Sequence, residues 1–395
     1  MMNTGFSITR LPRIEFGSGA IGRLPAILRQ YGQRILIVTG AQSFLASPHW
    51  LALSTQLNGA GFFWEIARVD GEPSPELIDE TVYALLGHSF DAVLGIGGGS
   101  ALDAAKAIAG LLKPGNSAMD HLEGVGPELP YRGPTTPFIA VPTTAGTGSE
   151  ATKNAVLSQH GHDGFKKSFR DDKLVAEYAV IDPDLLSTCP PGVLAANGMD
   201  AFTQLLESYV STKANPFTDT LALCGMEAAR DSLLPWYEGT GDAATYRAKM
   251  AYAALLSGIT LAQVGLGSVH GLAAPLGAFF PIPHGVVCGT LVAEASRVNI
   301  QAMRNRDADN RALTRYAVVG RLLAQQGLPD EVAIQFLLKT LEDWTHRLKL
   351  PRLADYGIKE SDLDHIVANS RGSSMKTNPI ALTDDEVTQI IRARL

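Results

Sequence analysis

Residues 265–285, GLGSVHGLAAPLGAFFPIPHG, lie in the longest uncharged run of the chain. Between residues 250 and 293 there is no Asp, Glu, Lys or Arg. Gly, Pro, Ser and Gln interrupt this run too often to leave the ~18 clean apolar residues of a membrane span. The run therefore predicts a buried segment of a folded domain. Its two histidines, His270 and His284, are expected in the core, where each imidazole needs a polar partner.

Those two histidines allow two interpretations. A single buried histidine is more often hydrogen-bonded to a backbone carbonyl than bound to a metal. Here the spacing is His-x13-His, and Pro281 and Pro283 turn the chain back between the two rings. This pattern favours a shared metal ion.

A carboxylate for such an ion is available on a predicted helix over residues 194–210. Asp200, Gln204 and Glu207 stand there at positions i, i+4 and i+7, which share one face of a helix. A solvated polar face is the alternative. The neighbouring residues are apolar, however, and a partly buried carboxylate needs a cation or a hydrogen-bond donor.

Length and composition bound the class of protein. A chain of 395 residues predicts two domains. Its 33 basic and 40 acidic residues give a net charge of −7, which argues against nucleic acid or an anionic membrane as the main partner. Cys189, Cys224 and Cys288 are widely spaced and form no CxxC, so a reduced, cytoplasmic setting is expected. The amino terminus has no apolar core of a signal peptide. Cys288 is interpreted as a core residue.

The pattern of the chain changes near Pro183, Pro190 and Pro191. Before this point short apolar runs alternate with helical periodicity, which predicts an open, mostly parallel sheet with helices on both faces. After it, helical periodicity dominates. We expect an α/β domain over residues 1–185 and an all-helical domain, which carries the candidate metal residues above, over residues 186–395. The predicted strands cover residues 34–39, 62–69, 91–96 and 138–141, and the clearest predicted helices cover residues 51–59, 75–87, 101–112, 194–210, 216–234, 243–261, 309–326, 331–348 and 384–395.

A glycine turn, Gly97-Gly98-Gly99-Ser100, follows a predicted strand and opens a helix. Glycines let the backbone approach an anion, and the free N–H groups at a helix start favour negative charge. The turn is not the G-x-G-x-x-G fingerprint, because no glycine stands at its last position. Tight strand–helix packing is the alternative to a phosphate site.

A second loop, PTTAGTGSE at residues 142–150, also follows a predicted strand. Its hydroxyl groups suit a pyrophosphate or a ribose, although they could instead bond to the local backbone. Two such loops at strand ends of one sheet fit a crevice for a dinucleotide.

Four segments together resemble the iron-containing (group III) alcohol dehydrogenase family: GGGSALDAAK (97–106), PTTAGTGSE (142–150), GMDAFTQLLESYVS (198–211) and HGLAAPLGAFFPIPHG (270–285). The resemblance implies the dehydroquinate synthase-like architecture of that family. A nicotinamide cofactor and a divalent metal, Fe²⁺ or Zn²⁺, are implied with it. It also implies a homo-oligomer, a dimer or larger.

The resemblance places the metal ligands at Asp200, Gln204, His270 and His284, with the aspartate and the two histidines as the catalytic groups. The family pattern has a histidine where Gln204 stands, and a glutamine oxygen is a weaker, harder ligand. Many members also carry a proton-relay histidine where this chain has Ala274. The proton is therefore expected to move through water or a ribose hydroxyl of the cofactor.

The resemblance also implies contacts to the cofactor. NAD-preferring members often have an aspartate where this chain has Gly40, so NAD and NADP both stay open. Leu261, Asn154 and Ser374 fall at family positions near the substrate. The implied cofactor-binding residues are Gly40, Gly97, Gly98, Gly99, Ser100, Asp103, Thr143, Thr144, Thr147, Ser149, Thr152 and Lys166.

These observations predict hydride transfer between a small primary alcohol, or its aldehyde, and NAD(P), with help from the metal. If Arg371 or Lys376 reaches the site, an acidic aldehyde becomes a candidate substrate, whereas an exposed loop charge is the more common role. Two alternatives are a metal-independent enzyme like maleylacetate reductase and a catalytically silent NAD(P)-binding sensor.

Overall fold

The computed structural model describes residues 5–395, which form two compact units. The α/β unit contains Thr9–Gln159 and Lys166–Cys189. The helical unit contains Pro190–Leu395, residues 160–165 and the stretch that ends at Ile8. The ranges predicted from the sequence did not include these two short additions to the helical unit.

A six-stranded sheet forms the centre of the α/β unit, in the order β1-β8-β5-β4-β2-β3. All neighbouring strands are parallel, as predicted. Ile37 is in register with Leu94, and Gly97 with Pro142. The strands are β1 (Arg13–Phe16), β2 (Arg34–Gly40), β3 (Phe63–Val69), β4 (Ala92–Gly97), β5 (Phe138–Pro142) and β8 (Tyr178–Ile181).

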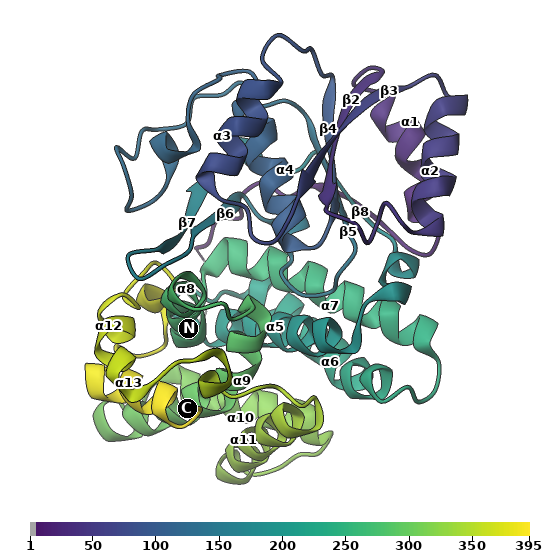
Figure 1. Cartoon of the computed structure of the whole chain (residues 1–395). Helices are drawn as coiled ribbons and strands as arrows, with labels where there is room; N and C mark the ends of the chain where they lie inside the picture. Colours follow the sequence, from purple (N-terminus) through teal and green to yellow (C-terminus); the bar gives the residue numbers. More distant parts are fainter. Residues whose placement is uncertain (1–4) are drawn as a thin grey trace. The chain divides into compact units, whose positions relative to one another are not determined.

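The inner strands of the sheet are continuous apolar runs, so helices must cover both faces of the sheet there. Helices α1 (Leu24–Leu28) and α2 (Pro48–Gly59) cover one face, where they share a core with Ile35 and Ile37 (Figure 1). Helices α3 (Pro75–Ala84) and α4 (Gly99–Leu111) lie on the other face. Gly95 lets α4 come close, because a Cβ there would lie 2.7 Å from Ala105 Cβ. This contact fixes the start of α4 at the end of β4.

A separate two-stranded sheet pairs β6 (Asn154–Gln159) with β7 (Phe165–Arg170). The sequence did not predict either strand. The linking residues 160–165 belong to the helical unit, where the His162 and His365 rings stack with centroids 4.7 Å apart.

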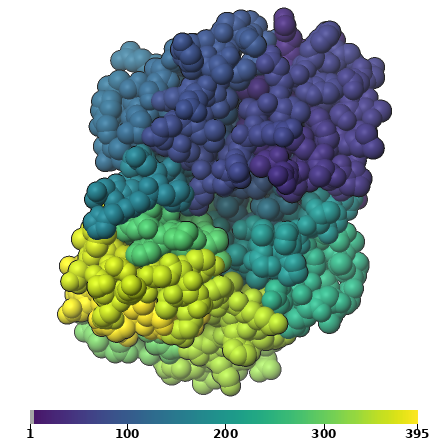
Figure 2. Space-filling view, viewed as in Figure 1, coloured from purple at the N-terminus to yellow at the C-terminus, as the bar shows by residue number. Residues whose placement is uncertain are grey.

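Helix α5 is the central element of the helical unit, and every residue from Gly198 to Val210 is buried. It packs against α6, α7 and α9. Helix α13 packs on α9 and α12, and the yellow C-terminal part of the chain lies on the visible surface of this unit (Figures 1 and 2). The helices are α5 (Pro191–Val210), α6 (Pro216–Tyr237), α7 (Ala243–Val264), α8 (Ser268–Phe279), α9 (His284–Arg306), α10 (Arg311–Ala324), α11 (Asp330–Arg347), α12 (Leu363–Ala368) and α13 (Asp384–Arg392).

Residues 265–285 form the turn after α7, the whole of α8 and the first two residues of α9. Within residues 5–395 no single helix is long and apolar enough to cross a bilayer. Helices α7 and α8 meet that criterion only as a pair bent by 100°.

Candidate metal centre and nucleotide site

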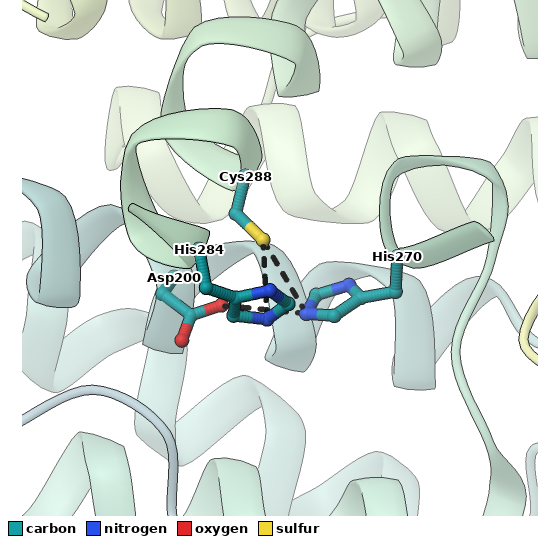
Figure 3. A group of neighbouring side chains, drawn as sticks. All are labelled: Asp200, His270, His284 and Cys288. Carbon is teal, nitrogen blue, oxygen red and sulfur yellow. Dashed lines mark hydrogen bonds and ion pairs between the residues drawn. The ribbon is translucent and has the colours of Figure 1, made fainter. Parts of the chain in front are cut away.

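Four side chains from three helices converge inside the helical unit (Figure 3). Asp200 comes from α5, His270 from α8, and His284 and Cys288 from α9. One potential ligand atom of each residue lies within 4.8 Å of those of the other three. His284 is the first residue of α9 and Cys288 stands four residues later, so both project from one face of that helix.

The individual distances are short. His270 Nε2 lies 3.3 Å from Asp200 Oδ1, and His284 Nε2 lies 3.7 Å from the same oxygen. Cys288 Sγ lies 3.6 Å from His270 Nε2 and 3.7 Å from His284 Nε2. The four potential metal-ligand atoms therefore lie around one common point.

Glu207, two turns after Asp200 on α5, orients His270. The ring Nδ1 of His270 donates to Glu207 Oε2 over 2.6 Å, and Val269 N donates to Oε1 over 2.7 Å. Gly267 makes room for this carboxylate, because a Cβ there would lie 2.9 Å from Oε1. Since a carboxylate only accepts, the proton of His270 is held on Nδ1 and Nε2 faces the cluster.

Asp200, His270 and Cys288 are buried, whereas His284 is partly exposed, and the four groups affect one another electrostatically. Burial raises the pKa of Asp200, but His284 and His270 outweigh it and hold the pKa below its usual value. Burial lowers the pKa of His270, but Cys288, Asp200 and Glu207 together raise it well above the ordinary range. Burial raises the pKa of Cys288 to about 12. Asp200 is therefore an anion in a dry environment.

The residues present fit a divalent cation. Asp200 is fully buried, and its Oδ2 has no hydrogen-bond partner among residues 5–395. A buried carboxylate oxygen without a partner is costly unless a cation compensates it. Carboxylate, imidazole and thiolate groups are all ligands of Zn²⁺ and related metals.

Of the predicted metal ligands, Asp200, His270 and His284 are brought together. Gln204 is buried on the same helix, and its Oε1 accepts a hydrogen bond from Ser257 Oγ over 2.6 Å. Cys288 was interpreted only as a core residue: it is buried, but its sulfur faces the two imidazoles. The His284-x3-Cys288 spacing was the signal that could have identified it.

Gly40 and the predicted nucleotide residues of the glycine turn and the second loop follow the carboxyl ends of three neighbouring strands. Gly40 ends β2, Gly97 ends β4, and Thr143 follows β5, with Thr143 N donating to Gly97 O over 2.9 Å. The two loops touch, because a Cβ at Gly99 would lie 2.7 Å from the Thr147 side chain. Gly98 precedes α4, and no side chain of residues 5–395 caps that helix start. Its free N–H groups suit a phosphate.

Buried Lys106 joins α4 to the second loop, and sequence reasoning missed it although it ends the GGGSALDAAK motif. Its Nζ donates to Ser149 O over 2.9 Å, to Thr152 Oγ1 over 2.8 Å and to Asn154 O over 2.7 Å. Asp103 accepts from Ser149 Oγ and from the backbone N of residue 156. The side chains of Ser149, Thr152 and Asp103 thus hold the loop together.

Two predicted charged groups already have partners. Lys166 on β7 pairs with Glu72, and Arg371 pairs with Asp384 and donates to Leu382 O. These ion pairs neutralise both cations.

Comparisons with known proteins identify the family of this chain. The family described as "Iron-containing alcohol dehydrogenase" matches residues 12–183, and "Fe-containing alcohol dehydrogenase family, C-terminal" matches residues 194–395. The NAD-dependent methanol dehydrogenase of Bacillus methanolicus is 30% identical over 97% of this chain and 98% of that protein. The NADPH-dependent butanol dehydrogenase of Clostridium saccharobutylicum is 30% identical over 96% of each chain.

A solved structure supports the same relationship. The alcohol dehydrogenase from Oenococcus oeni is 28% identical, covers 99% of this chain and 100% of its own, and superposes with a TM-score of 0.88. The chain therefore belongs to the iron-containing alcohol dehydrogenase family and is an oxidoreductase that acts on CH–OH groups.

Proposed function

We propose that the protein is an NAD(P)-dependent, metal-assisted enzyme that transfers hydride between a small primary alcohol, or its aldehyde, and nicotinamide. The convergence of Asp200, His270 and His284 around one buried point carries this proposal. The names of the methanol and butanol dehydrogenases support a short neutral alcohol as substrate. The pairing of Arg371 with Asp384 places acidic substrates second.

Asp200, His270 and His284 would hold the divalent cation, which acts as a Lewis acid on the substrate oxygen when bound. Glu207 fixes His270 so that Nε2 presents its lone pair to the cluster. The surrounding helices shield Asp200, which is fully buried, and His270, which is 8% exposed, whereas His284 is partly exposed. Each electrostatic interaction is stronger in such a dry environment.

The glycine turn and the second loop would hold the nucleotide. Backbone N–H groups at the start of α4 would bind a phosphate there, because no side chain of residues 5–395 caps them. Lys106 keeps the second loop against α4, and this sets the position of Thr144 and Thr147 beside Gly98 and Gly99. The bound nucleotide supplies the hydride acceptor or donor.

A panel of alcohols and aldehydes assayed with NAD⁺, NADP⁺ and their reduced forms tests this function. We expect turnover of short primary alcohols or aldehydes by the wild type and its loss in His270→Ala. Binding of NAD(P) to that variant, measured by calorimetry, should stay near the wild-type value. Tight NAD(P) binding without turnover of any substrate would contradict the proposal, as would full activity of His270→Ala.

A further inference from the structure

Cys288 occupies a place in the metal cluster that the sequence did not predict. Its sulfur points at the two imidazoles and lies at nearly equal distances, 3.6 and 3.7 Å, from their Nε2 atoms (Figure 3). The residue is fully buried, and it stands one helical turn from His284. The sulfur therefore lies where it could bind the same metal ion as the two histidines.

The distances match a tetrahedral site. Bonds of about 2.0–2.1 Å to nitrogen and about 2.3 Å to sulfur put neighbouring tetrahedral ligands about 3.3–3.6 Å apart. The separations from His270 Nε2 are 3.3 Å to Asp200 Oδ1 and 3.6 Å to Cys288 Sγ. Those from His284 Nε2 are 3.7 Å to the same two atoms. Small shifts of the four side chains would bring their ligand atoms to bonding distance from one ion.

The alternative fourth ligand is weaker. Gln204 offers a neutral amide oxygen, which already accepts a hydrogen bond from Ser257. A thiolate is softer and is charged, so together with Asp200 it would neutralise a divalent cation in a dry site. We propose that Cys288 is the fourth protein ligand beside Asp200, His270 and His284, and that it directs the site towards Zn²⁺. This inference rests on the metal-assisted function proposed above.

A buried cysteine with no role beyond packing is the competing explanation. Such a thiol needs no histidine partners, whereas Cys288 contacts both rings of the cluster. A bound cation deprotonates a coordinating thiol outright, even where burial disfavours the free thiolate. Four protein ligands also leave room for catalysis, because zinc sites can expand to five-coordinate.

Cobalt substitution tests the inference directly on the full-length protein. The metal is removed with a chelator, and Co²⁺ is added while the absorption spectrum is recorded. We expect intense visible bands of tetrahedral cobalt and a near-ultraviolet sulfur-to-cobalt charge-transfer band in the wild type. Cys288→Ala should lose the charge-transfer band, whereas the matched variant Gln204→Ala should keep it. Circular dichroism and NAD(P) binding confirm that both variants are folded.

Zinc affinity, measured by competition with a chelating dye, provides the second readout. Cys288→Ala should weaken it by at least about 100-fold, because even the loss of outer-shell partners costs 10–100-fold. Gln204→Ala should leave it unchanged. Cobalt binding by the wild type without a charge-transfer band, or equal zinc affinity in Cys288→Ala, would overturn the inference and leave the proposed function intact. A wild type that binds no metal yet turns over alcohols would refute both the ligand set and metal assistance.

Discussion

At the scale of single residues, two carboxylates of α5 bracket the His270 ring. Glu207 accepts from Nδ1 over 2.6 Å, and Asp200 lies 3.3 Å from Nε2. The two acids are seven residues apart on one face of α5. This spacing leaves room for the His270 ring between their carboxylates. Glu207 therefore acts through His270 and does not touch the proposed ion.

Glu207→Gln keeps the size of the side chain but weakens its pull on the Nδ1 proton. We expect metal affinity to fall by about 10–100-fold, as for other second-shell partners of histidine ligands. Dye competition measures this affinity, and unfolding monitored by circular dichroism controls for stability. Unchanged affinity in a folded Glu207→Ala variant would contradict the orienting role.

Gly40 is a second residue at which a single side chain is expected to set a property, here the preference between NAD⁺ and NADP⁺. A Cβ at this residue meets no atom within 4 Å, so a side chain can begin there without a clash. A carboxylate at the end of β2 would repel a 2′-phosphate, and Gly40→Asp should lower NADP⁺ affinity by at least about tenfold while NAD⁺ affinity holds. Fluorescence titration with both nucleotides measures the ratio. An equal loss for both would mean that Gly40 lies away from the adenosine ribose.

Glu150 makes stability depend on pH. Burial raises the pKa of its carboxyl from 4.5 to about 7. Between these values the unfolded chain loses the proton while the folded chain keeps it, so the contribution of Glu150 to stability falls as the pH rises. Glu150→Gln has no such proton to lose. Its free energy of unfolding relative to that of the wild type should therefore rise by on the order of 3 kcal/mol from pH 4 to pH 8. Denaturant unfolding at both pH values checks this; a difference independent of pH would contradict it.

At the scale of elements, the start of α4 brings the two nucleotide loops together. Gly99 lies so close to Thr147 that any Cβ would collide with its side chain. The close approach of the two loops therefore requires a glycine at this position, independently of the proposed phosphate.

Gly99→Ala should lower NAD(P) affinity by at least about tenfold, because the added methyl displaces the loop and blocks the anion site. Metal content should not change, since the cluster belongs wholly to the other unit. Gly22→Ala, where a Cβ meets nothing within 4 Å, is the matched control. Normal nucleotide binding by Gly99→Ala would argue that the turn only packs a strand against a helix.

The elements that were predicted well from the sequence have clear ends, such as Gly40 at the end of β2. The strand at residues 34–39 and the helix at residues 216–234 agree with β2 and α6, which begins with the capping residue Asn215 and a proline. Helices α8 and α9 were not predicted. Residues 268–279 are buried almost without interruption, and a helix covered on all sides has no polar face to reveal its period.

That gap explains why the site was predicted incompletely. Asp200, His270 and His284 were proposed from motifs. The His284-x3-Cys288 spacing points to Cys288 only once residues 284–306 are known to be helical. Lys106 was missed for a similar reason. Its partners lie 43 to 48 residues later in the chain and meet it only in the folded unit.

At the scale of the whole molecule, the chemistry is divided between two folded units. The glycine turn belongs to the α/β unit, and the four side chains of the candidate metal site belong to the helical unit. Substitutions in one cluster should therefore spare the other binding function. The predicted oligomer and cytoplasmic location stay predictions.

The central claim, that a cation in the helical unit assists hydride transfer, is tested most directly by removing and restoring the metal. Alcohol-dependent reduction of NAD(P)⁺ is measured on enzyme as purified, after chelation, and after addition of one equivalent of Zn²⁺. We predict that chelation abolishes turnover while NAD(P) binding persists, and that zinc restores it. Chelated enzyme with no detectable metal and full activity would contradict the claim and favour a metal-independent reductase.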